Sequence, residues 1–381
     1  MARPSADAIV IGAGIVGAAC AGELARAGMR VTVLESGFAA GGTTAAGMGH
    51  LVAMDDSPAQ LALTALSLRL WRELRASLHA AVEYDPCGTI WVAEDAEQLG
   101  AVEEKASVYR AHGLECETLD AARLAALEPN LRRGLAGGLR VAGDAVLYPP
   151  SAALELLDAS RSHGAALREG CRVLEIIPHG VRTDSGTLHA DVIVNAAGAH
   201  AATLTPLLPI VPRKGHLAIT GRSPGFCRHQ LVELGYLASA HRMTSESVAF
   251  NVQPRTTGQM LIGSSRELVG WREGLNRGVL RAMLQRAVHF MPTLARLPVI
   301  RTWTGFRPAT PDKLPLIGRW EPVDGLWIAA GHEGLGITTS LGTAQLLADV
   351  VLGRPPSIDA APFAPSRVLA ANAVTAQDAV A

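Results

Sequence analysis

Cysteine is scarce and scattered in this chain of 381 residues. The five cysteines are Cys20, Cys87, Cys116, Cys171 and Cys227. They are far apart and odd in number, and none belongs to a Cys-x-x-Cys pair, so neither a disulfide framework nor a zinc or iron–sulfur site is indicated. We therefore expect reduced thiols, a cytoplasmic location and no bound metal.

The chain also lacks an excess of charge and long apolar runs. Its formal net charge is -1, which provides no field to attract nucleic acid or acidic lipid. No apolar run approaches the roughly 20 residues needed to cross a bilayer. The seven residues before the first expected strand are too few for a signal peptide. With 49% hydrophobic residues the composition is that of a globular protein, and the length favours two domains.

The first motif is a glycine turn between two apolar runs. A short apolar run leads into Gly12-x-Gly14-x-x-Gly17, and a second run at 31–34 ends in Glu35. This order predicts a strand, a helix and a second strand that bind an adenine dinucleotide. The glycines permit a tight turn, close approach of a pyrophosphate to the helix N-terminus, and packing of the helix on the strand. Glu35 would accept hydrogen bonds from a ribose.

Helical and strand-like patterns alternate along the chain and predict two interleaved domains. Residues 60–78, 97–112 and 274–290 have helical patterns, whereas 217–220 and 248–252 alternate like strands of an antiparallel sheet. We expect an α/β fold, in which a doubly wound, Rossmann-like dinucleotide domain carries an inserted antiparallel-sheet substrate domain. The expected boundaries are 1–83, 145–206 and 306–360 for the dinucleotide domain, 84–144 and 207–305 for the substrate domain, and 361–381 for a loose tail.

Two further motifs follow the glycine turn. Residues 192–198 read Val-Ile-Val-Asn-Ala-Ala-Gly; residues 305–318 begin Gly-Phe-Arg-Pro and lead to a Gly-His-Glu-Gly-Leu-Gly-Ile loop at 331–337. With the glycine turn and the Gly-Thr-Thr loop at 42–44, they make residues 7–352 resemble the FAD-dependent amine and amino-acid oxidoreductases typified by D-amino-acid oxidase, glycine oxidase and sarcosine oxidase. The motifs are similar in character to glycine oxidase and to the catalytic subunits of heteromeric D-hydroxyproline dehydrogenases and opine oxidases.

The resemblance implies that FAD is the cofactor. Gly305 stands where some relatives attach the flavin through a cysteine, so binding is expected to be non-covalent. The residues expected to contact FAD are Gly12, Gly14, Ile15, Val16, Gly17, Glu35, Ser36, Gly42, Thr43, Thr44, Ala46, Gly47, Met48, Val173, Ala197, Gly198, Arg307, Gly331, His332, Glu333, Gly334, Leu335, Gly336, Ile337 and Thr338. In the family, the residues that correspond to 331–338 turn a helix N-terminus towards the flavin. The helix dipole there stabilises negative charge on the reduced ring.

Arg307 is expected to bind the substrate. It matches the arginine of the family's Gly-x-Arg-Pro motif, and a planar guanidinium binds a carboxylate in bidentate fashion. A hydride would then pass from the substrate Cα to flavin N5 and leave an imine. The resemblance implies a small D-amino acid or secondary amine acid, of the glycine, sarcosine, D-proline, hydroxyproline or opine type. Glycine oxidase has a second basic residue where this chain has Gly334. The resemblance therefore does not imply a second residue that binds the substrate carboxylate at that position.

Other side chains are candidates for the site. His50 follows the second glycine-rich loop and is a candidate to face the flavin. Tyr236 and His241 lie in a loop-rich region that covers the substrate in relatives. By contrast, Lys214 is expected at the surface or at the cofactor edge, and Arg255, which follows a proline in a turn, is expected to face solvent.

Other functions stay open at this point. One is a flavin-bearing electron-transfer or docking subunit of a heteromeric dehydrogenase. Another is an NAD-dependent dehydrogenase, which the glycine turn alone would allow but which has no need of the C-terminal flavin motif. A non-enzymatic nucleotide sensor has no positive feature in the sequence. The expected partners are a small amine or amino-acid substrate and an electron acceptor, which is oxygen, a quinone or a partner subunit, with no nucleic acid and no transmembrane segment.

Overall fold

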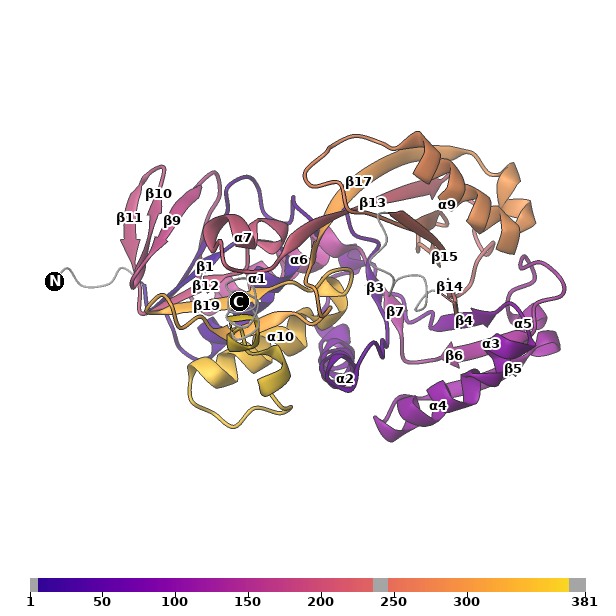
Figure 1. The fold of residues 1–381 in the computed structure, drawn as a ribbon, viewed down its shortest axis with the longest axis horizontal. Helices are drawn as coiled ribbons and strands as arrows, with labels where there is room; N and C mark the ends of the chain where they lie inside the picture. The colour runs from indigo at the N-terminus through magenta and orange to yellow at the C-terminus, as the bar shows by residue number, and fades with distance from the viewer. Residues whose placement is uncertain (1–5, 236–245, 370–381) are drawn as a thin grey trace, which may run out of the picture.

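The computed structural model describes residues 6–235 and 246–369, and two large sheets dominate it (Figure 1). The first sheet has six strands in the order β18-β19-β12-β1-β2-β8. They are β1 (Ala8–Ile11), β2 (Val31–Leu34), β8 (Ala166–Arg168), β12 (Val192–Asn195), β18 (Leu316–Arg319) and β19 (Leu326–Ala330). All neighbours are parallel except β18 and β19. This is the doubly wound sheet that the glycine turn predicts.

The six-stranded sheet packs against other elements on both of its faces. Its central strands are apolar throughout, so both faces bury apolar side chains. Ala8 and Val10 of β1 belong to one core cluster and Ile9 and Ile11 to another, as the alternation of side chains along a strand requires. The elements that supply these two cores are α1 (Ile15–Arg26), α6 (Pro149–Ser162) and α10 (Gly336–Val351) for the first, and β9 (Val173–Ile177), β10 (Gly180–Thr183) and β11 (Gly186–His189) for the second.

The second sheet has eight strands in the order β17-β13-β16-β15-β14-β4-β6-β5. They are β4 (Thr89–Ala93), β5 (Cys116–Asp120), β6 (Gly137–Val141), β13 (Val211–Thr220), β14 (Gln230–Glu233), β15 (Glu246–Pro254), β16 (Met260–Glu267) and β17 (Val299–Ala309). Neighbours are antiparallel except β14 and β4. Helix α9 (Arg277–Phe290) covers one face, where Met283 packs in a core with Ile90 and Phe250. The expected combination of a doubly wound sheet and an antiparallel sheet is confirmed.

Two of the longer helices begin at side-chain capping residues. Ser57 and Asn276 cap α2 (Pro58–Leu74) and α9, since each side chain accepts a hydrogen bond from a first-turn N–H. The single helix expected over 97–112 is instead two helices that meet at Ala101. The remaining elements are α3 (Ala96–Gly100), α4 (Val102–Ala111), α5 (Ala121–Leu127), α7 (Ala201–Leu204) and the paired short strands β3 (His50–Leu51) and β7 (Ala145–Val146). In the described part of the chain, no helix is long and apolar enough to span a membrane.

Residues 361–369 are packed on the molecule, which differs from the loose tail predicted from residue 361 onwards. Phe363 is 1% exposed and belongs to the core under the six-stranded sheet. Arg367 forms an ion pair with Asp312 at 2.7 Å and donates to the Leu314 carbonyl at 2.8 Å. One aromatic anchor and one ion pair fix the segment, and an alanine- and proline-rich stretch gives no periodic pattern that predicts them. The division of the rest into domains stays a prediction, and β17 runs across its boundary at 305/306.

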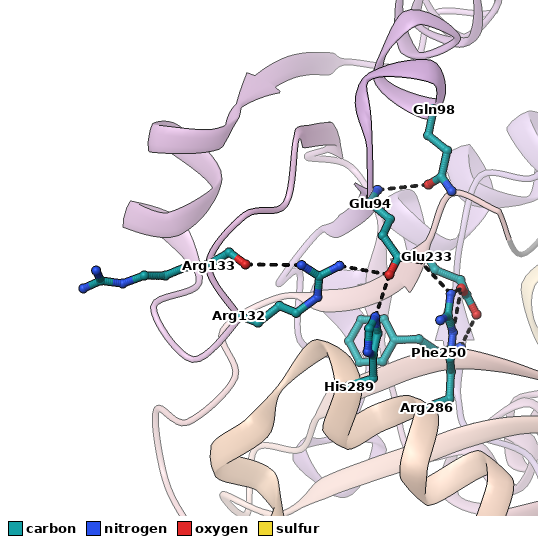
Figure 2. Close-up of polar contacts among 8 residues, drawn as sticks. All are labelled: Glu94, Gln98, Arg132, Arg133, Glu233, Phe250, Arg286 and His289. Carbon is teal, nitrogen blue, oxygen red and sulfur yellow. Dashed lines mark hydrogen bonds and ion pairs between the residues drawn. The ribbon is translucent and has the colours of Figure 1, made fainter.

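A network of charged side chains ties α9 to the ends of strands β4 and β14 of the eight-stranded sheet (Figure 2). Arg132 and Arg286 donate to the Glu94 carboxylate at 2.9 and 3.1 Å. His289 Nε2 lies 2.6 Å from the same carboxylate, and Arg286 also pairs with Glu233. These groups come from a strand end, a loop and a helix that are far apart in sequence. The network therefore fixes the helix on the face opposite the candidate site described next.

Candidate functional site

A cavity of about 930 Å³ lies between the two large sheets. On one side it is lined by residues that follow the carboxyl ends of the parallel strands, with Gly12 after β1, Glu35 after β2 and Ala197 after β12. On the other side it is lined by one face of the eight-stranded sheet. The carboxyl edge of a doubly wound sheet is where such folds bind ligands. The cavity is therefore the candidate functional site.

The glycine turn after β1 has the close packing that a dinucleotide site requires. Gly12 has a φ of +103°, and a Cβ there would lie 2.7 Å from the Ala196 carbonyl oxygen. A Cβ at Gly17 would clash with the Gly12 carbonyl, so helix α1 can pack directly on the turn. Gly14 lines the cavity at the N-terminus of α1, where free N–H groups and the helix dipole favour an anion.

Glu35 and Thr44 fix the loops around this turn. The two oxygens of the Glu35 carboxylate accept hydrogen bonds from the N–H groups of Ala13 and Gly37, at 3.0 and 2.9 Å. Thr44 Oγ1 accepts from the N–H of Ile15, in the first turn of α1, at 3.0 Å. Both side chains line the cavity. The carboxylate expected to bind a ribose is thus held at the carboxyl end of β2 by two backbone donors.

The second glycine-rich loop packs closely on β17 and on the first turn of α10. A Cβ at Gly47 would lie 2.8 Å from Ile337 Cδ1, and a Cβ at Gly305 would clash with Ala46 Cβ. Trp303 Nε1 donates to the Ala46 carbonyl at 3.3 Å. Small residues therefore allow three segments, each remote from the others in sequence, to meet in the cavity wall.

Most of the residues predicted to contact FAD line this cavity. They are Gly12, Gly14, Ile15, Val16, Glu35, Ser36, Gly42, Thr43, Thr44, Ala46, Gly47, Met48, Val173, Ala197, Gly198, Arg307, His332, Glu333, Gly334, Leu335, Gly336 and Ile337. The other three, Gly17, Gly331 and Thr338, do not line the cavity but contact segments next to it. A Cβ at Gly331 would lie 2.6 Å from Thr310 Cγ2, and Thr338 Oγ1 donates to the His50 carbonyl at 2.9 Å. The geometry is consistent with the predicted contacts, which themselves stay a prediction.

The eight-stranded sheet presents one face to the cavity, and its edge strand β17 contributes the intervening residues Thr304, Phe306 and Pro308 as well. The lining residues of that face include Arg301, Trp303, Gly305 and Arg307 on β17, Arg213, Gly215 and Leu217 on β13, Ser264 and Arg266 on β16, and Asn251 on β15. Successive side chains of a strand point to opposite faces. Strand register thus places these residues on one face, whereas the register partners Lys214 and Glu267 belong to the other.

Arg307 lies on this face, and one glycine makes room for its guanidinium. A Cβ at Gly215, on the neighbouring strand β13, would clash with the guanidinium. A Cβ at Gly334, in the loop before α10, would lie 3.6 Å from Arg307 Nε. Arg307 Nη1 donates to the Ser265 carbonyl at 2.9 Å. The predicted carboxylate-binding group is therefore held in one orientation in the cavity wall.

Two buried arginines that the sequence analysis did not select lie beside Arg307. Arg213 is its direct register partner on β13, and Arg266 follows on β16; they are 3% and 5% exposed. Arg266 Nε donates to Glu333 Oε1 at 3.1 Å, and Arg213 Nη1 lies 3.5 Å from the same oxygen. Burial alone would raise the pKa of Glu333, but Arg266, Arg307 and Arg213 lower it to about 2. Strand register, which the sequence does not display, brings the three arginines together, and the loop before α10 adds Glu333.

His50, the predicted flavin-facing histidine, lines the cavity in its neutral form. Because a carbonyl can only accept, the 3.1 Å contact of His50 Nε2 with the Gly334 oxygen places the ring proton on Nε2. Burial lowers the pKa of His50 to about 4, although this hydrogen bond opposes the shift. Burial likewise lowers the pKa of His332 to about 3. Tyr236 and His241, the remaining predicted catalytic residues, lie outside the described residues.

Two basic residues expected at the surface are buried instead. Lys214 is 2% exposed and lies 3.2 Å from the Glu267 carboxylate, on the face of β13 away from the cavity. Arg255 has a side chain that is 9% exposed and pairs with Glu83 at 2.6 Å. A buried cation needs a nearby carboxylate, and in both cases that partner comes from a distant segment. Local sequence around the lysine and the arginine does not reveal it.

Comparison with known proteins gives matches over almost the whole chain. Residues 7–350 match the family model described as FAD dependent oxidoreductase, DAO. A glycine oxidase of Pseudomonas aeruginosa is 30% identical, with 94% of this chain and 98% of that protein covered. The hydrogen cyanide synthase subunit HcnC of the same species is 29% identical, with 95% and 96% covered. The crystal structure of iminodiacetate oxidase from Chelativorans sp. BNC1 has a TM-score of 0.81 at 28% identity, with 94% and 98% covered.

Proposed function

Because this chain belongs to the family of FAD-dependent oxidoreductases, we propose that it oxidises the C–N bond of a small amino acid or secondary amine acid whose carboxylate is bound by Arg307. It is an FAD-dependent enzyme of amino-acid or amine oxidation. The observation that carries the proposal is the guanidinium of Arg307, held by the Ser265 carbonyl in the wall of the cavity. Candidate substrates are D-amino acids, glycine, sarcosine, D-proline or hydroxyproline, and opines.

The cavity has the features that FAD requires. The turn at Gly12 excludes a Cβ, and the N-terminus of α1 at Gly14 is suited to a pyrophosphate. Glu35, which lines the cavity after β2, would accept hydrogen bonds from the adenosine ribose. Helix α10 begins at Gly336 in the cavity wall, so its N-terminal dipole would stabilise negative charge on the reduced ring. We infer that these residues hold the two halves of the cofactor.

The chain's contribution to the reaction is orientation and exclusion of water. FAD, held by the residues above, would supply the acceptor for two electrons and one hydrogen from the substrate Cα. Arg307 would hold the carboxylate so that the Cα–H faces the ring. The substrate nitrogen releases a proton to solvent, and water hydrolyses the resulting imine to a 2-oxo acid and an amine or ammonia. No strong base is required, in agreement with a His50 pKa of about 4 that leaves the ring neutral and bonded to Gly334.

An anaerobic titration tests the proposal. The purified holoprotein is freed of oxygen and mixed in turn with D-amino acids, glycine, sarcosine, D-proline and cis-4-hydroxy-D-proline, and with secondary amine diacids. We expect at least one compound to bleach the yellow flavin absorbance. A flavin-loaded protein that none of them reduces would contradict the proposed reaction. Readmission of air then separates an oxidase, which recovers its colour quickly, from a dehydrogenase, which does not.

A second candidate function is a flavin-bearing subunit that works within a heteromeric complex. The similar HcnC is by its name a subunit of hydrogen cyanide synthase, which favours this alternative. The same titration discriminates the two functions. Reduction of the flavin in the isolated chain supports a complete catalytic unit, whereas reduction that needs an added partner supports the subunit.

A further inference from the structure

The ladder between β13 and β16 is interrupted directly beside Arg307. Regular pairing is lost between Lys214 and Ala218 of β13, where the opposite stretch of β16 is longer. The Arg307 guanidinium lies over this interruption, because a Cβ at Gly215 would clash with it and its Nη1 donates to the Ser265 carbonyl at 2.9 Å. Bulges next to a site change the direction of individual groups. The interruption therefore presents a backbone carbonyl of β16 to Arg307.

Ser265 bridges the interruption with its side chain. Its Oγ accepts a hydrogen bond from the His216 backbone N–H at 2.8 Å, so a hydroxyl stands where a ladder carbonyl would otherwise accept. His216 Nδ1 lies 3.0 Å from the same Oγ, and both residues are fully buried. His216 belongs to the face of β13 away from the cavity. Ser265 thus contacts Arg307 on one side of the sheet through its carbonyl, and His216 on the other through its hydroxyl.

The hydrogen bonds of His216 fix its tautomer. Asn276, the capping residue of α9, donates its backbone N–H to His216 Nε2 at 3.0 Å. Burial lowers the pKa of His216, which keeps the ring neutral. A neutral imidazole that accepts at Nε2 carries its proton on Nδ1, so the ring donates to Ser265 Oγ. One histidine therefore connects α9 to the residue whose carbonyl contacts Arg307.

We propose that Ser265 and His216 are positioning residues, which hold the Arg307 guanidinium in the orientation that a substrate carboxylate requires. Neither residue lines the cavity, so both act through Arg307. Without the hydroxyl contact, the interrupted part of β16 loses its connection to β13, and the carbonyl of the same residue shifts with it. Small displacements of an orienting group are costly in a site that works by orientation. This inference rests on the proposed function and adds the residues behind the guanidinium.

Two matched probes measure the orientation of the guanidinium. Methoxyacetate has the shape of a small secondary amine acid with oxygen in place of nitrogen, so it offers no C–N bond for oxidation. Methoxyacetamide has nearly the same shape and no charge. Their dissociation constants are measured on the holoprotein from the change in the flavin spectrum. We expect the wild type to prefer the carboxylate at least about tenfold, as one charge-assisted contact allows. A general loosening of the cavity would weaken both probes alike, whereas a misplaced guanidinium lowers the preference.

Three variants separate positioning from structural support. Ser265→Ala removes the hydroxyl and is expected to lower the preference to about threefold or less. In His216→Asn the amide nitrogen takes the place of Nδ1 and keeps the contact with Ser265, so we expect a preference within about twofold of the wild type. In His216→Gln the amide reaches the place of Nε2 and keeps only the contact with Asn276, so the preference is expected to fall as in Ser265→Ala. Ser247→Ala is the matched control, because this buried hydroxyl on β15 has no partner among the described residues.

Flavin content and melting temperature show which variants are folded, and the serine variant and the histidine pair each decide alone. An unchanged preference in Ser265→Ala would overturn the inference. The same follows if His216→Gln keeps the preference as well as His216→Asn does, or better, since the histidine would then serve only to attach α9. A wild type that binds neither probe, or that does not distinguish them, would instead contradict the Arg307 contact. The proposed function would then fail together with the inference.

Discussion

Gly12 and Gly28 both have a positive φ, at +103° and +89°, but their surroundings differ. A Cβ at Gly12 would press on the Ala196 carbonyl, whereas nothing lies within 4 Å of one at Gly28. We expect Gly28→Ala to cost about 1–2 kcal/mol from the backbone conformation alone and to retain FAD. Gly12→Ala is expected to lose FAD and more stability. Flavin content after purification and urea unfolding measure both effects, and equal behaviour of the two variants would contradict the close approach.

Removal of the guanidinium at position 307 tests the carboxylate contact directly. We expect Arg307→Met to raise the substrate KM about 10–100-fold, the loss of a charge-assisted contact, while the protein keeps its bound FAD. Arg319→Met is the matched control, because Arg319 is an exposed residue of β18 outside the cavity. Steady-state kinetics with the best compound from the anaerobic titration supply the measurement. An unchanged KM in Arg307→Met would exclude this residue from substrate binding.

At the scale of secondary-structure elements, the ion pairs that attach α9 to the sheet make the stability of the protein depend on pH. Burial alone would raise the pKa of Glu94, but His289, Arg286 and Arg132 lower it to about 2. A carboxylate with a lowered folded pKa stabilises the protein above its ordinary pKa, and this contribution is lost as the pH falls towards 2. We expect Glu94→Gln to lower the free energy of unfolding by about 1 kcal/mol at pH 7, and by progressively less between pH 4.5 and pH 2.

Urea unfolding at several pH values checks the Glu94 prediction. Glu175→Gln is the control, because Glu175 pairs with Arg182 on an exposed hairpin where both side chains are about half exposed. An exposed pair of this kind contributes little. A Glu94→Gln effect that does not diminish in acid, or that is no larger than the control, would show that the network of Figure 2 does not stabilise the fold.

Elements with a strong apolar period were predictable, and those stabilised by their neighbours were not. The strand at 8–11 and the helix at 274–290 follow from apolar spacing, and Ser57 and Asn276 mark helix starts by capping chemistry. Strands β5 and β8 were missed because they are edge strands with largely exposed residues. An edge strand needs no continuous apolar pattern, since its partner supplies the hydrogen bonds.

At the scale of the whole molecule, FAD is expected to act as a structural bridge. The cavity that fits it has one wall from each large sheet, so the cofactor stabilises the folded form by mass action. We expect the melting temperature of the apoprotein to rise with added FAD, by an amount that corresponds to about 2.7 kcal/mol at one hundred times the dissociation constant. Differential scanning fluorimetry of stripped and reconstituted protein makes the comparison. A melting temperature independent of FAD would contradict a site between the sheets.

The sequence by itself determined the glycine turn and the combination of a doubly wound and an antiparallel sheet, and it selected Arg307 as the candidate for substrate binding, because these depend on residues close together or on motifs that are read in order. Only the tertiary structure decided which residues share the cavity wall. Lys214 and Arg213 are neighbours in sequence, yet one is buried with Glu267 and the other faces Glu333 and Arg307. Strand register sets that difference, because a shift of one residue moves every side chain to the opposite face.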